Sequence, residues 1–575
     1  MSKLYKIAIV GVGPRGLAAL ESLYLAKKNS NSSKKLKVVL FEASAYPGAG
    51  QIWTPNQVET NLSNIHERNL SNNLAGREAL YFDDVFIPEF PSYKNWLTTT
   101  DDDYSEKDVF PSRAKLGSYL NERFNTFREA LIGSDLVDFY QKEVTKIEPS
   151  ETGCLVYTKD DQQIEVDEAV LTIGHQPTYD SKQLTTWGKH AEENNLKLYE
   201  DPYPVGALET DSISAETTVA LRGFGLSMVD QVRALSIGFG GVFKEKKDSI
   251  KWEYIPSEKA PKHLVVFSLN GLPPAPKPVS ATIDNWFKPN EQEKQSFIRA
   301  IEKAEQRAAS IKDASFLIEA LAEMAASVYL RMSVHSRKHK LSHQELSQLT
   351  IQLIKDPDTA HDLILKHDLP ALEAMEHLLQ MAFGKTAISL DYCLGQVWRF
   401  ALGILYHDYT YLNLPDAAMV DVVNYIEASK RYSYGPPVKS LQQLMALVEA
   451  GVLNLDFVNN PTITPVENGW KLEKNNQSII TQVMVNSVID APQLVAVSSP
   501  LIQNLLEDKR VDPVSYKLGL HTLEDGSIIS KNGNSHQHIS LLGRLAKGSI
   551  IGVDDLIECF GKPAHKWADS LIERL

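Results

Sequence analysis

The clearest hydrophobic pattern in the chain is a short apolar run close to its beginning. Residues 6–10 read Lys-Ile-Ala-Ile-Val, which predicts a central parallel strand buried on both faces. The run leads directly into Gly11, Gly13 and Gly16, after which the spacing of apolar residues predicts a helix over 17–27. A strand, a glycine-rich turn and a helix in this order are typical of a unit that binds a dinucleotide.

Each glycine of this turn has a physical task. Gly11 permits the tight turn, Gly13 lets the backbone approach a diphosphate, and Gly16 lets the helix pack closely on the strand. The diphosphate would lie on the free N–H groups at the start of the helix, where Pro14 and Arg15 stand. All five residues are therefore candidates for cofactor binding.

A second apolar run, at 36–41, predicts the neighbouring strand, and it is followed by Glu42. An acidic side chain at this position can accept hydrogen bonds from a ribose. A glycine triplet alone would be compatible with an ordinary tight turn. The preceding strand, the following helix and the acid together favour dinucleotide binding.

A second unit of the same kind begins with an apolar run at 217–222. It leads into Gly223, Gly225, Leu226 and Ser227, and a helical pattern follows. The serine stands where the third glycine would be, and its hydroxyl is available to a phosphate at the helix start. One dinucleotide needs one unit, so two units imply two dinucleotides, FAD and a nicotinamide nucleotide.

The chain resembles the FAD/NAD(P)-binding oxidoreductases that share the two-dinucleotide plan of class B flavin monooxygenases and amine N-hydroxylases. The resemblance is carried by Gly-Val-Gly-Pro-Arg-Gly-Leu at 11–17 and by the segments 48–53, 111–113, 171–177 and 220–227. It implies a flavoprotein that binds FAD and either NADPH or NADH.

The resemblance adds candidates around the flavin. The glycine-rich loop that contains Gln51 and Trp53 is expected near it, although a surface turn with a packed tryptophan is the alternative. Arg113 is a candidate donor to a phosphate or carboxylate, with a plain surface arginine as the alternative. Gly543, after a C-terminal strand, is expected near the isoalloxazine ring.

Between the two units, alternating runs at 144–147, 155–157 and 163–166 predict a β-meander. The strand that follows ends at Gly174 and His175, where flavin domains bring a strand end back against the nucleotide. A structural hydrogen bond is the alternative role of His175.

Helical spacing dominates from about 290 to 453, in segments at 291–312, 314–334, 342–355, 357–367, 369–382, 388–406 and 415–430. We interpret this region as a substrate domain or lid, with a dimerisation or purely structural domain as the alternative. His335, His339 and His343 would share one face of a helix, and we interpret them as a solvated stripe and not as a metal site.

The predicted fold is therefore α/β, with two Rossmann-like dinucleotide-binding domains and an inserted, mainly helical domain. Residues 1–205 and 456–575 are assigned to a split FAD-binding domain, the latter including a strand at 482–491. Residues 206–288 are assigned to the NAD(P)-binding domain and 289–455 to the helical insert.

Composition narrows the function classes. The 575 residues carry a net charge of −14 without a large basic block, which argues against nucleic acid as a partner. No apolar run is long enough to span a bilayer, and the three cysteines show no metal-ligand spacing. We expect a cytoplasmic protein with a small-molecule substrate, with a homo-oligomer left open.

The leading hypothesis is an FAD-dependent oxidoreductase that takes hydride from NAD(P)H and acts as a monooxygenase on a small molecule, with N-hydroxylation of an amine or amino acid as the candidate reaction. The alternative is a flavin- or dinucleotide-binding sensor or a non-oxygenating reductase. Residues 268–273 lack the basic side chains expected from the family pattern, which leaves NADPH and NADH both open. No catalytic residue is assigned.

Overall fold

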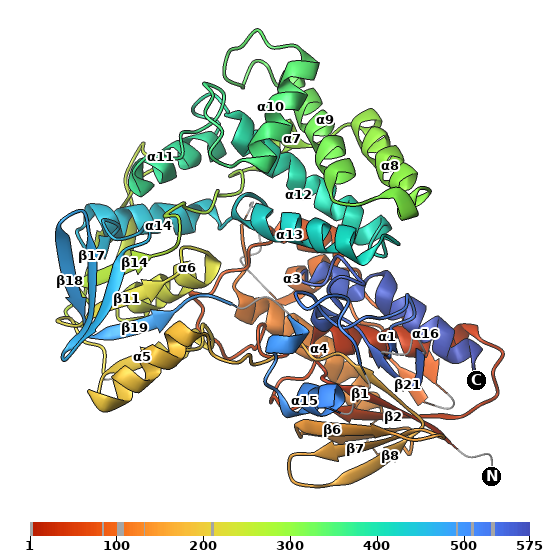
Figure 1. Ribbon diagram of the computed structural model, residues 1–575. Helices are drawn as coiled ribbons and strands as arrows, with labels where there is room; N and C mark the ends of the chain where they lie inside the picture. Colours follow the sequence, from red (N-terminus) through yellow and green to blue (C-terminus); the bar gives the residue numbers. More distant parts are fainter. Residues whose placement is uncertain are drawn as a thin grey trace.

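Two mainly parallel β-sheets and a helical lobe are the principal parts of this computed structural model (Figure 1). The structure describes residues 4–82, 85–100, 109–131, 133–208, 212–489, 493–507, 511–530 and 535–575. Each sheet belongs to one of the two predicted nucleotide units, so the α/β class with a helical insertion is confirmed.

The first sheet has six strands, of which five run parallel and the outermost, β20, runs antiparallel to its neighbour. In spatial order they are β20 (Ser527–Ile529), β21 (Ser535–Leu541), β9 (Glu168–Leu171), β1 (Tyr5–Val10), β2 (Leu36–Phe41) and β5 (Val137–Tyr140). The apolar run at 6–10 is the central strand, as predicted, and its residues from Ile7 to Val10 are buried.

Successive side chains of β1 point to opposite faces of the first sheet and belong to two separate hydrophobic cores. Ile7 and Ile9 pack with α1 (Pro14–Asn29), α4 (Arg113–Leu131) and α16 (Lys562–Glu573). Ala8 and Val10 face the opposite way, toward β6 (Val144–Pro149), β7 (Cys154–Thr158) and β8 (Gln163–Val166). These last three strands form the predicted antiparallel meander.

The second sheet has five strands, all parallel: β10 (Lys197–Tyr199), β19 (Val483–Asn486), β11 (Thr218–Arg222), β14 (His263–Phe267) and β15 (Leu453–Asn454). The predicted strand at 482–491 was therefore placed in the wrong sheet. Its described part, β19, pairs with β10 and β11 rather than with the flavin sheet. A fully buried apolar strand fits either parallel sheet, so the sequence pattern did not distinguish them.

Several segments of the predicted FAD domain thus complete the second sheet. One face of the sheet is covered by α5 (Lys182–Glu193) and by the meander β16 (Thr462–Val466), β17 (Gly469–Lys474) and β18 (Gln477–Thr481). The other face packs on α6 (Leu226–Arg233). The strands of the second sheet lie between residues 197 and 486. The chain therefore crosses from the first domain to the second before residue 197 and returns after 486.

The helical lobe lies over both sheets, with α13 and α14 nearest to them (Figure 1). It comprises α7 (Ala281–Phe287), α8 (Glu291–Glu305), α9 (Ser315–Arg331), α10 (His343–Lys355), α11 (Ala371–Ala382), α12 (Leu390–Asp408), α13 (Asp416–Ser433) and α14 (Val438–Glu449). The remaining elements are α2 (Glu67–Asn73), β3 (Leu80–Phe82), β4 (Val85–Ile87), α3 (Tyr93–Thr100), β12 (Val242–Glu245), β13 (Trp252–Ile255) and α15 (Pro500–Glu507).

Two helical predictions in this lobe were wrong. Residues 357–367 form turns, and the predicted histidine stripe does not lie on one helix, because a turn and an extended segment precede α10. His335 instead stacks on Trp286 with ring centroids 3.7 Å apart, and His339 stacks on Tyr329 at 5.6 Å. Among the described residues, no group of three His, Cys, Asp or Glu side chains is placed to hold a metal ion.

The close approach of α4 to the loop at residue 53 predicts a test of the packing. A Cβ at Gly117 would lie 1.5 Å from the Trp53 carbonyl oxygen, so Gly117→Ala should destabilise the protein by about 3 kcal/mol or more. Gly403→Ala, in α12 with no atom within 4 Å of the added carbon, is the control and should be neutral or slightly stabilising. Thermal unfolding of both variants measures the difference, and equal midpoints would contradict the packing.

Candidate functional site

The first glycine turn has the geometry of a diphosphate-binding loop. Gly11 adopts a φ of +89°, and a Cβ at Gly16 would lie 2.2 Å from the Gly11 carbonyl oxygen, so both positions require glycine. Gly13 is the N-cap residue of α1, and as a glycine it has no side chain to accept a hydrogen bond from the first turn. The N–H groups of Arg15 and Gly16 therefore have no side-chain cap, which fits an anion such as a diphosphate.

Glu42 braces this loop from the end of β2. Its carboxylate accepts hydrogen bonds from the backbone N–H of Val12 at 2.6 Å and of Ser44 at 2.8 Å. The side chain lies next to the nucleotide loop, as the sequence predicts, and its contact with a ribose stays a prediction.

The loop that contains Gln51 and Trp53 lies against the first glycine turn. The Gly48 N–H donates to the Val12 carbonyl oxygen at 2.6 Å, and a Cβ at Gly13 would stand 3.7 Å from the Gly50 Cα. Gln51 is exposed, and Trp53 is half-buried against the core of the first domain. The predicted proximity of this loop to the nucleotide loop is present, while contact with a flavin stays a prediction.

Arg15 lies in the first turn of α1 and is buried against Gly543. A Cβ at Gly543 would meet the Arg15 side chain at 2.7 Å, and Gly543 has a φ of +103°. The guanidinium donates to Glu558 at 2.9 Å. Burial raises the pKa of Glu558 to about 7 despite the attraction of Arg15. Two predicted cofactor-binding positions, from opposite ends of the chain, are thus brought together.

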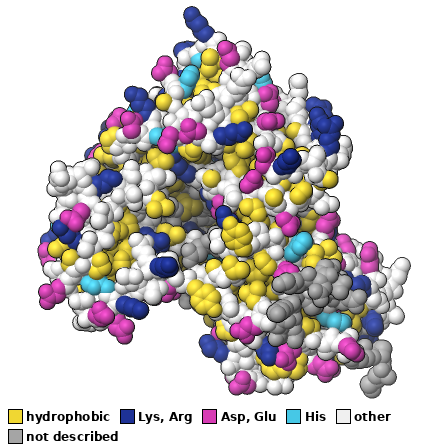
Figure 2. Space-filling view, in the orientation of Figure 1, with side chains coloured by type: hydrophobic (Ala, Val, Ile, Leu, Met, Phe, Trp, Pro, Cys, Tyr) yellow, Lys and Arg dark blue, Asp and Glu magenta, His cyan; other side chains and the backbone are white. Residues whose placement is uncertain are grey.

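Gly174 and His175 follow β9 and are exposed. A Cβ at Gly174 would meet no atom within 4 Å, so this strand end borders open space. Desolvation, together with the nearby charges of Arg544 and Lys430, lowers the pKa of His175 to about 4. Figure 2 shows a hollow between the lobe of the second sheet, the helical lobe and the first domain.

Arg113 connects the two nucleotide units. Its guanidinium donates to Asp230 of α6 at 2.7 Å, and the Tyr203 hydroxyl donates to the same carboxylate oxygen at 2.7 Å. Arg113 also lies over the Tyr203 ring, with 5.1 Å from its Cζ to the ring centroid. Arg113 was predicted to donate to a phosphate or a carboxylate, and the carboxylate that it contacts is that of Asp230. Its contact with a cofactor phosphate stays a prediction.

The second glycine turn repeats the geometry of the first. Gly223 has a φ of +117°, and its N–H donates to the Phe267 carbonyl oxygen at 2.7 Å. Gly225 caps α6 without a side-chain hydrogen bond, and a Cβ there would meet nothing within 4 Å. Leu226 opens the helix and is half-buried. The start of α6 therefore also fits a diphosphate.

Ser227 lies in the first turn of α6, and its contact with a phosphate stays a prediction. The side chain is buried and lies within hydrogen-bonding reach of the Tyr203 hydroxyl. It thus supports the contact between the two units, and its proposed role toward a phosphate has no geometric support beyond its place in the first turn of α6.

Comparison with known proteins bears on this geometry. Residues 8–176 match the model of a family described as FAD-NAD(P)-binding. This part of the chain is therefore similar to FAD-NAD(P)-binding domains. The match covers β1, the first glycine turn, the Gly50 loop and the strand end at Gly174, and the bounds of the FAD domain stay a prediction.

Two curated relatives extend the similarity. The chain is 28% identical over 276 residues to "Nitrosuccinic acid synthase npaA" of Aspergillus oryzae (strain ATCC 42149 / RIB 40), covering 46% of this chain and 40% of that protein. It is 25% identical over 299 residues to an "L-aspartate N-monooxygenase (nitrosuccinate-forming)" of Streptomyces cremeus, covering 46% and 42%. The matched regions thus span less than half of these curated relatives.

A solved structure of an OTEMO complex with FAD and NADP is 11% identical, with a TM-score of 0.46, and covers 100% of this chain and 84% of that one. At a TM-score below 0.5 this similarity supports no conclusion about this chain.

No described helix is long and apolar enough to cross a membrane.

Several buried charged residues around the cleft were missed by the sequence reasoning. Lys277, in the loop between β14 and α7, donates to the Asn64 carbonyl oxygen, and burial lowers its pKa to about 7. Asp284 of α7 pairs with Arg68 at 2.8 Å and also with Arg399 of α12. These partners are more than a hundred residues apart and carry no local motif, so no signal in the sequence identifies them.

Gly13→Ala tests the first nucleotide loop. The added Cβ makes only an ordinary contact, 3.7 Å from Gly50, so the apoprotein should fold with nearly unchanged stability. The methyl group would enter the space of the diphosphate, and we expect at least a tenfold loss of FAD affinity. Flavin fluorescence titration of the apoprotein measures it. Wild-type affinity in a folded variant would contradict the assignment of this loop.

Glu558→Gln tests the buried pair with Arg15. Because the pKa of Glu558 is raised to about 7 in the folded state, the folded protein binds more protons than the unfolded one between the two pKa values. The contribution of Glu558 to stability is therefore present at pH 4 and lost as the pH rises toward 7. Relative to the urea midpoint of the wild type, that of the variant should therefore rise from pH 5 to pH 7.5. A difference between the two midpoints that stays constant with pH would refute the raised pKa.

Proposed function

We propose that this protein is an FAD-dependent oxidoreductase that takes hydride from NAD(P)H and acts as a monooxygenase on the nitrogen of a small amine or amino acid. The observation that carries the proposal is the pair of uncapped helix starts, at Gly13 and Gly225, on two sheets joined by Arg113 and Asp230. The names of the relatives support N-oxygenation of an amino acid as the reaction.

The residues present fit both nucleotides. The start of α1 would hold the FAD diphosphate, with Glu42 beside its ribose, and the start of α6 would hold the diphosphate of the nicotinamide nucleotide. Bound FAD supplies the redox and oxygen chemistry. The protein binds both nucleotides, orients them across the junction between the domains and excludes water from it.

We assign the helical lobe the role of covering the substrate. Its helices α13 and α14 lie closest to the two sheets, and Arg233 of α6 donates to Gln443 of α14 and to the Thr60 carbonyl oxygen at 2.9 Å. A lobe that is bonded to α6 of the second unit in this way can hold the cleft closed around a reactive intermediate. Under this proposal the protein has three domains: the first sheet with its helices, the second sheet with its helices, and the helical lobe.

The first experiment is the absorption spectrum of the purified protein, before and after anaerobic addition of NADPH and then NADH. Oxidised flavin bands that bleach with one nucleotide would support the proposal and identify the donor. Aerobic oxidation of that nucleotide, with formation of an N-oxygenated amino acid, would complete it. A colourless protein, or a yellow one that neither nucleotide bleaches, would overturn it.

Gly225→Ala provides the matched variant for the second nucleotide. Its Cβ would meet no protein atom, so the fold and the FAD content should be those of the wild type. We expect the concentration of NADPH or NADH needed for half-maximal bleaching to rise roughly tenfold, because the methyl group blocks the diphosphate. Unchanged bleaching would show that the nucleotide does not bind at α6.

A further inference from the structure

An apolar pocket opens on the first domain, between α4 and the edge strand β5 of the first sheet. Its volume is about 300 Å³, which lies at the lower end of the range of small-molecule sites. Two phenylalanines and a leucine of α4 form one wall, and Leu20 of α1, Leu40 of β2 and Phe139 of β5 form the other. The pocket therefore has the lining and the size of a site for a small apolar ligand.

Arg128 of α4 marks the mouth of this pocket. It is the only charged side chain among the described lining residues, and it is exposed, as is Gly133 on the same rim. A Cβ added at Gly133 would meet no atom within 4 Å, so the approach to the pocket is open there. The guanidinium of Arg128 lies over the Phe139 ring, with 6.0 Å from its Cζ to the ring centroid. A ligand that enters the pocket thus passes a cation.

Within the described part of the chain, no carboxylate pairs with Arg128. Glu129 and Asp135, the two acids that follow it in the sequence, lie outside ion-pairing distance, and Asp138 of β5 pairs with Lys37 at 3.0 Å instead. A guanidinium has five N–H donors and matches the two oxygens of a carboxylate in geometry. Arg128 is therefore available to the carboxylate of a ligand.

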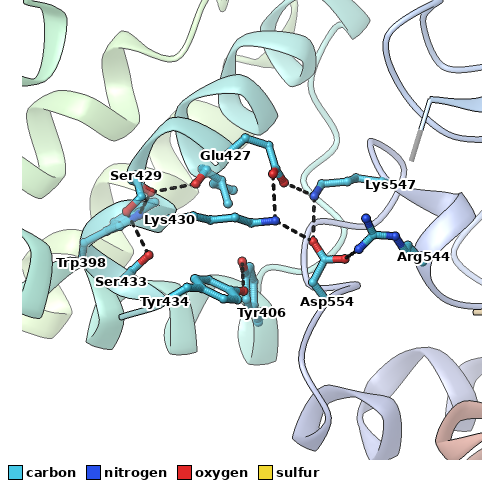
Figure 3. Close-up of polar contacts among 11 residues, drawn as sticks. Trp398, Tyr406, Glu427, Ser429, Lys430, Ser433, Tyr434, Arg544, Lys547 and Asp554 are labelled. Carbon is cyan, nitrogen blue, oxygen red and sulfur yellow. Dashed lines mark hydrogen bonds and ion pairs between the residues drawn. The ribbon is translucent and has the colours of Figure 1, made fainter. Parts of the chain in front are cut away.

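Cations elsewhere in the structure show the contrast. At the domain junction the carboxylate of Asp554 accepts hydrogen bonds from three cations, Arg544, Lys547 and Lys430 (Figure 3). These side chains hold the fold together, whereas Arg128 makes no such contact with the described residues.

The pocket is separate from both glycine turns. Gly133 precedes β5, so the mouth lies toward the amino end of that strand, whereas the glycine turns follow the carboxyl ends of β1 and β11. Arg128 also stands 15 residues after Arg113 on α4, which corresponds to about 22 Å along the helix. A ligand in this pocket would therefore be bound in addition to the two nucleotides.

We propose that this pocket binds a medium-chain aliphatic carboxylic acid, with its chain between α4 and the sheet and its carboxylate on Arg128. The apolar walls favour the chain, because they remove it from water without burying a polar group. The volume is roughly twice that of an apolar cavity of about 150 Å³ that holds benzene, so a chain of several methylene groups fits. The site does not depend on the proposed oxidoreductase function.

The test compares a chain with a head group against each part alone. The dissociation constants of octanoate, 1-octanol and acetate are measured by titration calorimetry on the purified protein. We expect octanoate to bind one molecule per chain, roughly tenfold more tightly than 1-octanol, and acetate not to bind. Equal constants for octanoate and 1-octanol, or no binding of octanoate at 1 mM, would overturn the proposal.

Arg128→Met tests the head-group contact. The side chain is exposed, so the variant should fold as the wild type does. We expect the constant of octanoate to rise roughly tenfold and that of 1-octanol to change less than about threefold. Arg299→Met, which removes an exposed arginine of α8, is the matched control and should change neither constant. If Arg128 serves only the C-terminal end of α4, or if octanoate binds in the cleft, Arg128→Met will leave octanoate unchanged and the proposal fails.

Val137→Phe tests the location of the chain. Val137 is a half-buried lining residue at the start of β5, where an aromatic side chain is compatible with a strand, and the larger ring would fill part of the pocket. Octanoate and 1-octanol should both bind roughly tenfold more weakly, while the flavin content stays that of the wild type. Unchanged binding of octanoate by this variant, once its thermal unfolding has shown that it is folded, would place the ligand elsewhere and refute the site.

Discussion

The buried contact of Arg113 with Asp230 is the interaction on which the arrangement of this protein depends. It joins α4 of the first domain to α6 of the second at 2.7 Å, and Tyr203 donates to the same carboxylate. Neither charge is stable alone at this depth, because removal of one partner leaves the other uncompensated in a low-dielectric environment. The pair therefore fixes the two glycine turns relative to each other, which the proposed transfer between two nucleotides would require.

The need of a buried charge for an oppositely charged partner recurs around the cleft. Arg15 is held by Glu558, Asp284 by Arg68 and Arg399, and Asp554 by three cations. In each case at least one partner comes from a segment that is more than a hundred residues away in the sequence. Polar contacts of this kind have directional geometry, so they specify how the lobes dock more narrowly than apolar packing does.

The path of the chain explains why these contacts are needed. Along the chain, β10 of the second sheet comes before the glycine turn of the second unit, and β15 and β19 come after the helical lobe. The lobe is therefore an insertion into the second unit, between β14 and β15. Two crossings between the domains bring distant segments into contact at the junction. The C-terminal segment then returns to the first sheet as β20 and β21 and delivers Gly543, Arg544 and Asp554 to the cleft.

The sequence by itself determined the features that depend on local patterns. The buried run at 6–10, the glycines of both turns, the β-meander and most helices of the lobe follow from side-chain periodicity and backbone freedom, which act within a few residues. The tertiary structure alone decided the sheet to which β19 belongs, the burial of Ser227 against Tyr203 and the partner of Arg113. A buried parallel strand has the same composition in either sheet, and a buried charge selects its partner through space, so neither choice leaves a signal along the chain.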